Sequence, residues 1–125
     1  MIKDINNNLY NMLDTIVKVV VDRPIGSFHP EFNNLIYRLN YGHIENVIAP
    51  DGEEQDAYII GISEPIKYFT GKVIAIIHRL DDIEDKLVVA PVNMNFTDKE
   101  IKRLVSFQEK FFKSEIIQKC NIDQL

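Results

Sequence analysis

The sequence has a single cysteine, Cys120, and no tryptophan. One cysteine cannot form a disulfide within the chain, so an apolar core must hold the fold together. This cysteine usage is typical of a reducing, cytoplasmic compartment. Cys120 lacks the His and Asp context of a nucleophile, and we expect it to be an ordinary residue at a helix end.

Long apolar runs and an excess of basic charge are also missing. No apolar stretch approaches the roughly 20 residues that span a bilayer, and the N-terminus lacks the apolar region of a signal peptide. We therefore expect no export and no membrane. The chain has 14 Lys and Arg against 19 Asp and Glu, a net charge of −5. This balance argues against a nucleic acid partner and is compatible with carboxylates gathered around divalent cations.

What is present is enough apolar sequence for one core. The 125 residues, of which 46% are hydrophobic, suit one domain, 1–125. Runs rich in β-branched residues predict five strands, at 16–21, 35–39, 57–62, 72–78 and 86–90. Turns rather than helices separate these runs. That spacing favours a small, mostly antiparallel barrel over a parallel sheet with crossover helices.

A helix is predicted at each end of the chain. Apolar residues recur at helical spacing from Ile2 to Ile16, which predicts a short amphipathic helix for packing or a subunit contact. Thr97 and Glu100 fit a capping box, in which each residue satisfies an exposed N–H of the other. The apolar stripe that follows, as far as Ile116, predicts a C-terminal helix across the barrel. The expected class is α+β.

Two acidic stretches are the best candidates for chemistry. Asp51 to Asp56 holds four carboxylates in six positions, in a turn shaped by Pro50 and Gly52, and Asp81 to Asp85 lies between the last two predicted strands. Alternate loops of an antiparallel meander share one end of a barrel, so we expect the two stretches to meet. Mg²⁺ prefers oxygen ligands, and a pair of such ions activates water towards phosphoryl groups. The alternative is that both are solvated turns.

These stretches, with the residues around them, resemble a known family. Asn40-Tyr41-Gly42, Ala49 to Asp56, and Asp81 to Asp85 followed by Lys86-Leu87-Val88-Val89 are similar to family I inorganic pyrophosphatases. That family carries Asp-Gly-Asp-Pro-x-Asp, and a short bacterial branch of it carries Asp-Gly-Glu-Glu, as here. The likeness covers roughly positions 17 to 113. It implies an OB-like barrel, a homo-oligomer, and hydrolysis of pyrophosphate with Mg²⁺, or with Mn²⁺ as a substitute.

The resemblance also implies roles for individual residues. The residues that match metal ligands are Asp51, Asp56, Asp81, and Glu84 or Asp85. Glu53 stands where the family has the aspartate associated with the attacking water. The residues that match phosphate or site contacts are Tyr41, Lys86 and Lys113, the last on the final helix. Asp22 matches an early acidic residue that supports the site, and Arg23, His29 and Arg38 are candidates for the family's early basic residues.

Departures from the family pattern keep a second reading open. Glu53 is one methylene longer than aspartate, and Phe112 lacks the hydroxyl of the family's tyrosine. The chain is therefore either a phosphoanhydride hydrolase or a catalytically weak or inactive module that binds phosphate and metal. A third reading is an oligomeric scaffold with solvated acidic loops. We expect His78 to pack or form an ion pair, and His43 to line the cleft.

Overall fold

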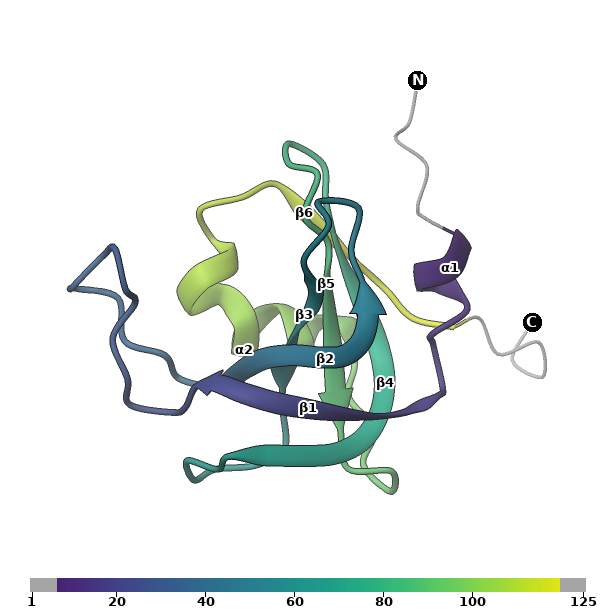
Figure 1. Ribbon diagram of the computed structural model, residues 1–125, viewed down its shortest axis with the longest axis horizontal. Helices are drawn as coiled ribbons and strands as arrows, with labels where there is room; N and C mark the ends of the chain where they lie inside the picture. Colours follow the sequence, from purple (N-terminus) through teal and green to yellow (C-terminus); the bar gives the residue numbers. More distant parts are fainter. Residues whose placement is uncertain (1–6, 120–125) are drawn as a thin grey trace.

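The structure of the protein is a computed structural model (Figure 1), and residues 7–119 of it are described. The elements, in chain order, are α1 (Asn7–Tyr10), β1 (Ile16–Arg23), β2 (Asn40–Ile48), β3 (Glu54–Ile59), β4 (Tyr68–Arg79), β5 (Lys86–Ala90), α2 (Asp98–Glu109) and β6 (Ser114–Ile117). None of the helices in this part of the chain has the length and apolar character of a membrane span.

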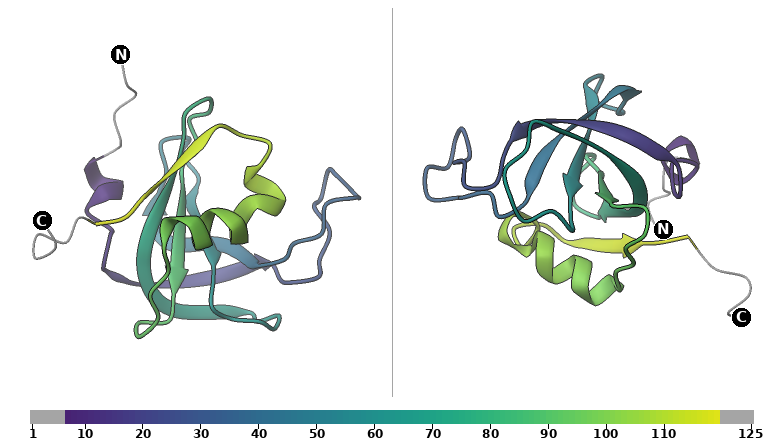
Figure 2. Two further views of the ribbon diagram at one scale, coloured as in Figure 1. Left: turned by 180° about the vertical axis from the view of Figure 1, so that it is seen from behind. Right: turned by 90° about the horizontal axis from the view of Figure 1, so that it is seen from below.

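Five strands close into a barrel. They pair in the order β1-β2-β3-β5-β4, and β4 pairs back with β1. All neighbours are antiparallel except β3 and β5, which are parallel. The sixth strand, β6, pairs with the C-terminal end of β4, residues 76–79. Figure 2 shows α2 and β6 on the side of the barrel opposite β1. The expected OB-like, mostly antiparallel barrel with a C-terminal helix is confirmed.

A close approach of two strands requires glycine at position 42. Gly42 on β2 pairs with Val21 on β1, and a Cβ at this position would collide with the Val20 carbonyl oxygen. One residue later the β1–β2 register shifts between Val21 and Arg23. Such an irregularity turns side chains at a strand end to new directions, and here it affects Asp22 and Arg23.

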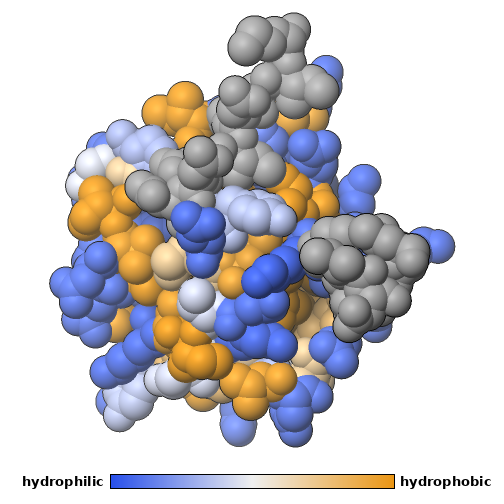
Figure 3. Space-filling model, turned by 90° about the vertical axis from the view of Figure 1, so that its right-hand side faces the viewer, coloured by the Kyte–Doolittle hydropathy of each residue, from blue (hydrophilic) through white to orange (hydrophobic). Residues whose placement is uncertain are grey.

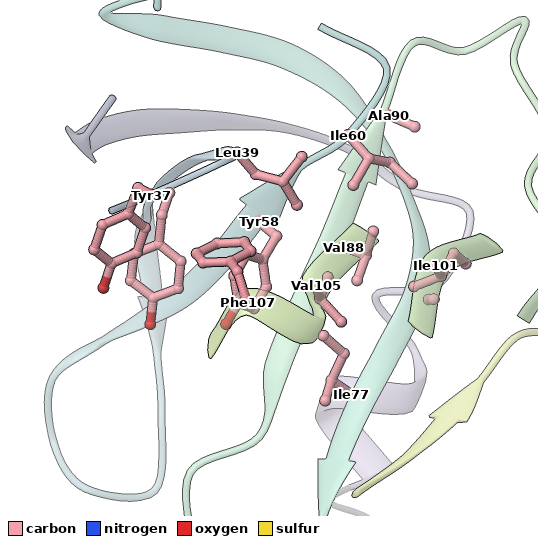
Figure 4. Close-up of a cluster of buried hydrophobic side chains, with 12 residues drawn as sticks. Tyr37, Leu39, Tyr58, Ile60, Ile77, Val88, Ala90, Ile101, Val105 and Phe107 are labelled. Atoms are coloured by element: carbon pink, nitrogen blue, oxygen red, sulfur yellow. The ribbon is translucent and has the colours of Figure 1, made fainter. Parts of the chain in front are cut away.

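The strands divide their side chains between two apolar clusters, as alternation along a strand requires. On β3, Ala57 and Ile59 join a cluster that draws on all five barrel strands and on Leu9 and Leu13. Tyr58 on β3 points to the other cluster, in which Ile101, Val105 and Phe107 of α2 cover the strands (Figure 4). Burying these side chains is the main force that holds α2 against the barrel.

The structure corrects three of the predicted elements. Residues 35–39 are not a strand: their backbone turns back on the preceding loop, with Tyr37 N–H donating to the Ser27 carbonyl (2.9 Å) and a single bridge between Phe28 and Ile36. The barrel has no place for them, because β2 already pairs with both β1 and β3. In the described residues the N-terminal helix covers only Asn7–Tyr10, and positions 1–6 lie outside them.

The C-terminal helix begins as predicted and ends early. Thr97 Oγ1 accepts from the Glu100 N–H (3.1 Å), and Glu100 Oε1 accepts from the Thr97 N–H (2.8 Å), which completes the capping box. The helix ends at Glu109, and Ile116 belongs to β6 instead. Residues 114–117 form backbone hydrogen bonds with the edge of β4 instead of continuing the helix. Cys120 lies outside the described residues. Figure 3 shows apolar side chains scattered among polar ones on the face that carries α1, and an oligomer contact there stays a prediction.

Candidate active site

The two acidic hairpins reach the same end of the barrel (Figure 1). Loop 49–53 joins β2 to β3, and loop 80–85 joins β4 to β5. Together they enclose a pocket of about 410 Å³. Its acidic lining residues are Asp22, Asp51, Glu53, Glu54, Asp56, Glu84 and Asp85. We call this the acidic pocket. Among the described residues, the basic groups that line it are Lys86 and the His43 ring.

Several of these carboxylates already have partners within the protein. Asp51 Oδ1 accepts from the Glu53 N–H (3.0 Å), and Glu54 Oε2 accepts from the Asn46 N–H (2.9 Å). Both carboxylate oxygens of Asp85 have partners. Oδ1 accepts from the Arg79 N–H (3.0 Å), and Oδ2 lies 2.9 Å from His78 Nδ1. Asp85 therefore orders its own loop, and Glu84 is the one of the two alternatives that turns towards Lys86.

The donor chemistry fits a hard divalent cation, which prefers carboxylate oxygens and retained waters. The Glu53 carboxylate forms no hydrogen bond or ion pair with any other residue in the described part of the chain. No three His, Cys, Asp or Glu side chains of residues 7–119 are already arranged around one metal position. The acidic pocket thus supplies carboxylate oxygens, and those of Asp51, Glu54 and Asp85 already accept hydrogen bonds within the protein.

Lys86 lies between this pocket and a second one and lines both. Its ammonium donates to Asp56 Oδ2 (2.7 Å) and lies 3.5 Å from Glu84 Oε1. Tyr41 OH donates to the same Asp56 oxygen (2.9 Å). The Lys86 side chain is only 5% exposed, against 32% for Asp56, so a buried cation faces a partly solvated carboxylate. Asp56, Glu84 and Lys86 line both pockets.

The second pocket has a volume of about 860 Å³. At its inner end, by which we mean the end formed by the buried Arg79 and Lys86, these cations lie beside Asp56 and Glu84. We call it the basic pocket. Its cationic lining residues are Arg23, Arg79, Lys86 and Lys110. Arg23 lies over the rings of Tyr37 and Tyr41, 5.5 and 5.6 Å from their centres. Arg79 stacks on Phe112 at 3.6 Å. Cations held against aromatic rings keep their charge near a ligand while remaining fixed in place.

A buried chain of hydrogen bonds fixes two of these cations from α2. It runs through Arg23, Tyr37, Gln108, Tyr58, Glu109 and Arg79, with links of 2.6, 2.5, 2.6, 2.7 and 2.6 Å. Arg79 makes a second bond to Glu109 through Nε (3.1 Å). The two-pronged Arg–carboxylate pair is the strongest of these links. The end of α2 therefore positions both arginines of the basic pocket.

Burial and neighbouring charge alter the titration of two groups at the site. The pKa of Tyr41 is well above its usual value, because burial and then the Asp56 charge disfavour the phenolate. Tyr41 is thus a fixed hydrogen-bond donor. The pKa of His43 is raised, mainly by its hydrogen bond to Asp22 (2.8 Å), with Glu54 and Asp56 adding to the effect. A protonated His43 would balance part of the acidic pocket.

The structure gathers most of the residues that the sequence singled out. Those around the acidic pocket are Asp22, Asp51, Glu53, Asp56, Glu84, Asp85 and Lys86, and those around the basic pocket include Arg23 and Tyr41. Asp81 and Lys113 line neither pocket. Asp81 accepts from the Lys113 N–H (3.2 Å), and Lys113 lies between α2 and β6 instead of on the final helix. His43 lines the acidic pocket, as expected.

Sequence reasoning missed the cations and their supports on the helix side. Lys110, Gln108, Glu109 and Arg79 belong to none of the motifs that the sequence singled out. The available signal was the polar pair Gln108-Glu109, which continues the helical spacing of the apolar Ile101 and Val105. The structure buries both side chains. Buried polar groups need partners, and here the partners are Tyr37, Tyr58 and Arg79.

Comparison with known proteins agrees at the level of fold. No protein-family model and no curated protein matches the sequence. Among solved structures, the inorganic pyrophosphatase from Ehrlichia chaffeensis superposes with a TM-score of 0.65 at 14% identity, covering 85% of this chain and 87% of that one.

Two further structures show the same likeness. The inorganic pyrophosphatase from Neisseria gonorrhoeae gives a TM-score of 0.55 at 20% identity, covering 74% and 70% of the two chains. That from Thermus thermophilus gives 0.56 at 14% identity, covering 84% and 80%. This chain therefore has the fold of the bacterial inorganic pyrophosphatases.

Proposed function

We propose that the protein hydrolyses pyrophosphate, or a related phosphoanhydride, with Mg²⁺ in the acidic pocket. The observation that carries the proposal is the contact between a carboxylate pocket and a cationic pocket that share Asp56, Glu84 and Lys86. Hydrolysis of a phosphoanhydride needs a polyanion held beside an activated water. One pocket supplies oxygen donors for cations, and the other supplies fixed positive charge for the substrate.

In this proposal the carboxylates of the acidic pocket have different roles. Asp51, Asp56 and Glu84 would hold Mg²⁺, which supplies charge neutralisation and a more acidic bound water when present. Asp22 would act through His43, whose ring it orients at 2.8 Å. Asp85 would keep loop 80–85 in place through Arg79 N–H and His78. Asp81 has no support from the pocket geometry and is the weakest of the predicted ligands.

Glu53 is the proposed general base. It lines the acidic pocket, and its side chain is not tied to any other residue in the described part of the chain. A base that is not held by the protein is available to take a proton from water. The water oxygen would then bond to one phosphorus while the bridging oxygen leaves with the other phosphate. Lys86, Arg23 and the Tyr41 hydroxyl would bind the phosphate oxygens on the basic side.

The alternative is a module that binds phosphate and metal with little or no turnover. Two observations favour it. Lys86 already occupies Asp56 Oδ2 at 2.7 Å, and no group of residues within 7–119 is prearranged for a metal. Substrate and cation would have to draw Lys86 away from Asp56. The alternative thus predicts ligand binding without release of phosphate.

A phosphate-release assay with pyrophosphate and Mg²⁺, repeated with Mn²⁺, separates the two. We expect release by the native chain and a loss of about 100-fold or more in Asp56→Asn, because a proposed Mg²⁺ ligand is removed; circular dichroism should show the fold retained. The matched control is Glu45→Gln, which removes one charge from β2 at an exposed position outside both pockets. Binding of pyrophosphate by calorimetry without release would favour the module. Equal release by Asp56→Asn and Glu45→Gln would end the proposal.

A further inference from the structure

The basic pocket is larger and more apolar at its outer end than pyrophosphate requires. Its volume, about 860 Å³, is about twice that of the acidic pocket. Its lining residues that reach the surface, which we call the outer end, include Phe32, Leu35, Phe111 and the His29 ring. Pyrophosphate is polar on every side and has no apolar group that could pack against these side chains. Pyrophosphate alone would leave these apolar side chains without a contact.

Two of these rings are left in contact with water. Phe32 is 62% exposed and Phe111 is 66% exposed. They come from different parts of the chain, loop 24–39 and the residues after α2, and face the same pocket. His29 lies 4.9 Å from the Phe32 ring, and 6.1 Å from Tyr37 in a parallel stack. Exposed apolar rings that gather at a pocket commonly mark a binding surface.

The order of groups along the pocket indicates the shape of the ligand. The inner end has Arg23, Arg79 and Lys86 at strand ends, next to the proposed hydrolytic centre. The aromatic residues of the outer end belong to loop 24–39, which projects from the barrel (Figure 1), and to the segment after α2. A ligand that fills both ends carries linked phosphates at one end and a flat aromatic group at the other.

We propose that the substrate is a nucleoside diphosphate or triphosphate, whose base stacks on Phe32 and Phe111 while its phosphates lie at the cationic end. This inference rests on the proposed phosphoanhydride chemistry for its inner end. Aromatic rings stack on every nucleobase because each base has a π-face. The pocket therefore selects for a base without choosing among bases. A second protein is a poorer occupant, because the inner end is a concave, charged extension of the acidic pocket.

The test compares two non-hydrolysable probes by calorimetry in Mg²⁺: methylenediphosphonate and α,β-methylene-ADP. We expect the nucleotide analogue to bind about 10-fold tighter or more, as one stacked base allows. Phe32→Ala and Phe111→Ala should each remove most of that advantage and leave methylenediphosphonate binding unchanged. The matched control is Phe28→Ala, which truncates a 61% exposed ring of the same loop outside the pocket.

The outcomes separate this inference from the proposed function. Equal affinity of the native chain for the two probes would overturn the nucleotide inference and leave pyrophosphate hydrolysis standing. Base-dependent binding with no phosphate release from ADP, ATP or pyrophosphate would support stacking of a base in the pocket, but it would overturn the hydrolase and the nucleotide's role as substrate. If neither probe binds at millimolar concentration, both fail. Equal loss in Phe28→Ala and Phe32→Ala would also overturn the stacking role.

Discussion

Lys86 donates a 2.7 Å hydrogen bond to Asp56 across the boundary between the two pockets. The pair is unequal, because the lysine side chain is 5% exposed and the aspartate is 32% exposed. Removing either partner therefore has different consequences: one change leaves a buried ammonium short of its counter-ion, and the other leaves a carboxylate that water can reach.

We expect Asp56→Asn to lower the free energy of unfolding by about 1–3 kcal/mol, the usual cost of a buried charged donor that loses its partner. Lys86→Met should cost less than about 1 kcal/mol, since Asp56 keeps the Tyr41 hydroxyl and contact with water. Urea unfolding followed by circular dichroism measures both. A larger loss for Lys86→Met than for Asp56→Asn would contradict this account of the pair.

Glu109 should be the most important polar residue for stability at the end of α2. It accepts from Arg79 and from Tyr58, and it is 4% exposed. Glu109→Ala would leave the buried Arg79 guanidinium with weaker compensation, and we expect a loss of about 3 kcal/mol. Glu109→Gln, which keeps one acceptor, should lose less. A loss below 1 kcal/mol in urea unfolding of Glu109→Ala would show that the buried chain contributes little.

Glu53 offers a test of the proposed base. Glu53→Gln should lower the rate of phosphate release by about 100-fold or more, as expected for removal of a general base. Glu53→Asp should raise turnover, because the shorter side chain matches the aspartate that family I inorganic pyrophosphatases, which this sequence resembles, carry at the equivalent position. Stability should change little in either variant, since the side chain is exposed. Unchanged release by Glu53→Asp would remove side-chain length as the limit on the rate.

The capping box of α2 should make stability depend on pH. Hydrogen bonds from Thr97, from its N–H first, lower the pKa of Glu100 below its ordinary value. A lowered pKa in the folded state stabilises the fold above the ordinary pKa, and this contribution is lost as the pH falls through the lowered value. In Glu100→Gln that acid-side loss should vanish. Urea unfolding at several pH values from neutral to acidic compares the two chains, and parallel curves would refute the prediction.

Thr97→Ala tests the same cap at neutral pH. It removes the Oγ1 acceptor for the Glu100 N–H (3.1 Å), and we expect the free energy of unfolding to fall by about 1 kcal/mol. Thr97→Ser keeps the hydroxyl and serves as the control. A native-like midpoint for the alanine variant would mean that packing of Ile101 and Val105 alone holds the start of α2.

Much of the barrel could be predicted from local sequence. Leu87 to Ala90 is a continuous apolar run between Lys86 and Pro91, and the strand covers Lys86–Ala90. The residues 35–39 were misread because an apolar run does not tell a strand from a loop that packs inward. Tyr37 and Leu39 are buried in the core without strand pairing. Burial, rather than pairing, explains their apolar character.

The sequence by itself determined the turn-separated apolar strands, the helix start at Thr97 and the two acidic hairpins, because alternation, capping and turn chemistry act over a few residues. Tertiary structure alone decided the parallel contact of β3 with β5, the end of α2 at Glu109, and the meeting of Arg23, Arg79 and Lys86 in one pocket. These features depend on which strand edges remain available after the barrel closes. They also depend on which buried charged groups pair with residues distant in the sequence. Neither condition can be predicted from a short stretch of sequence.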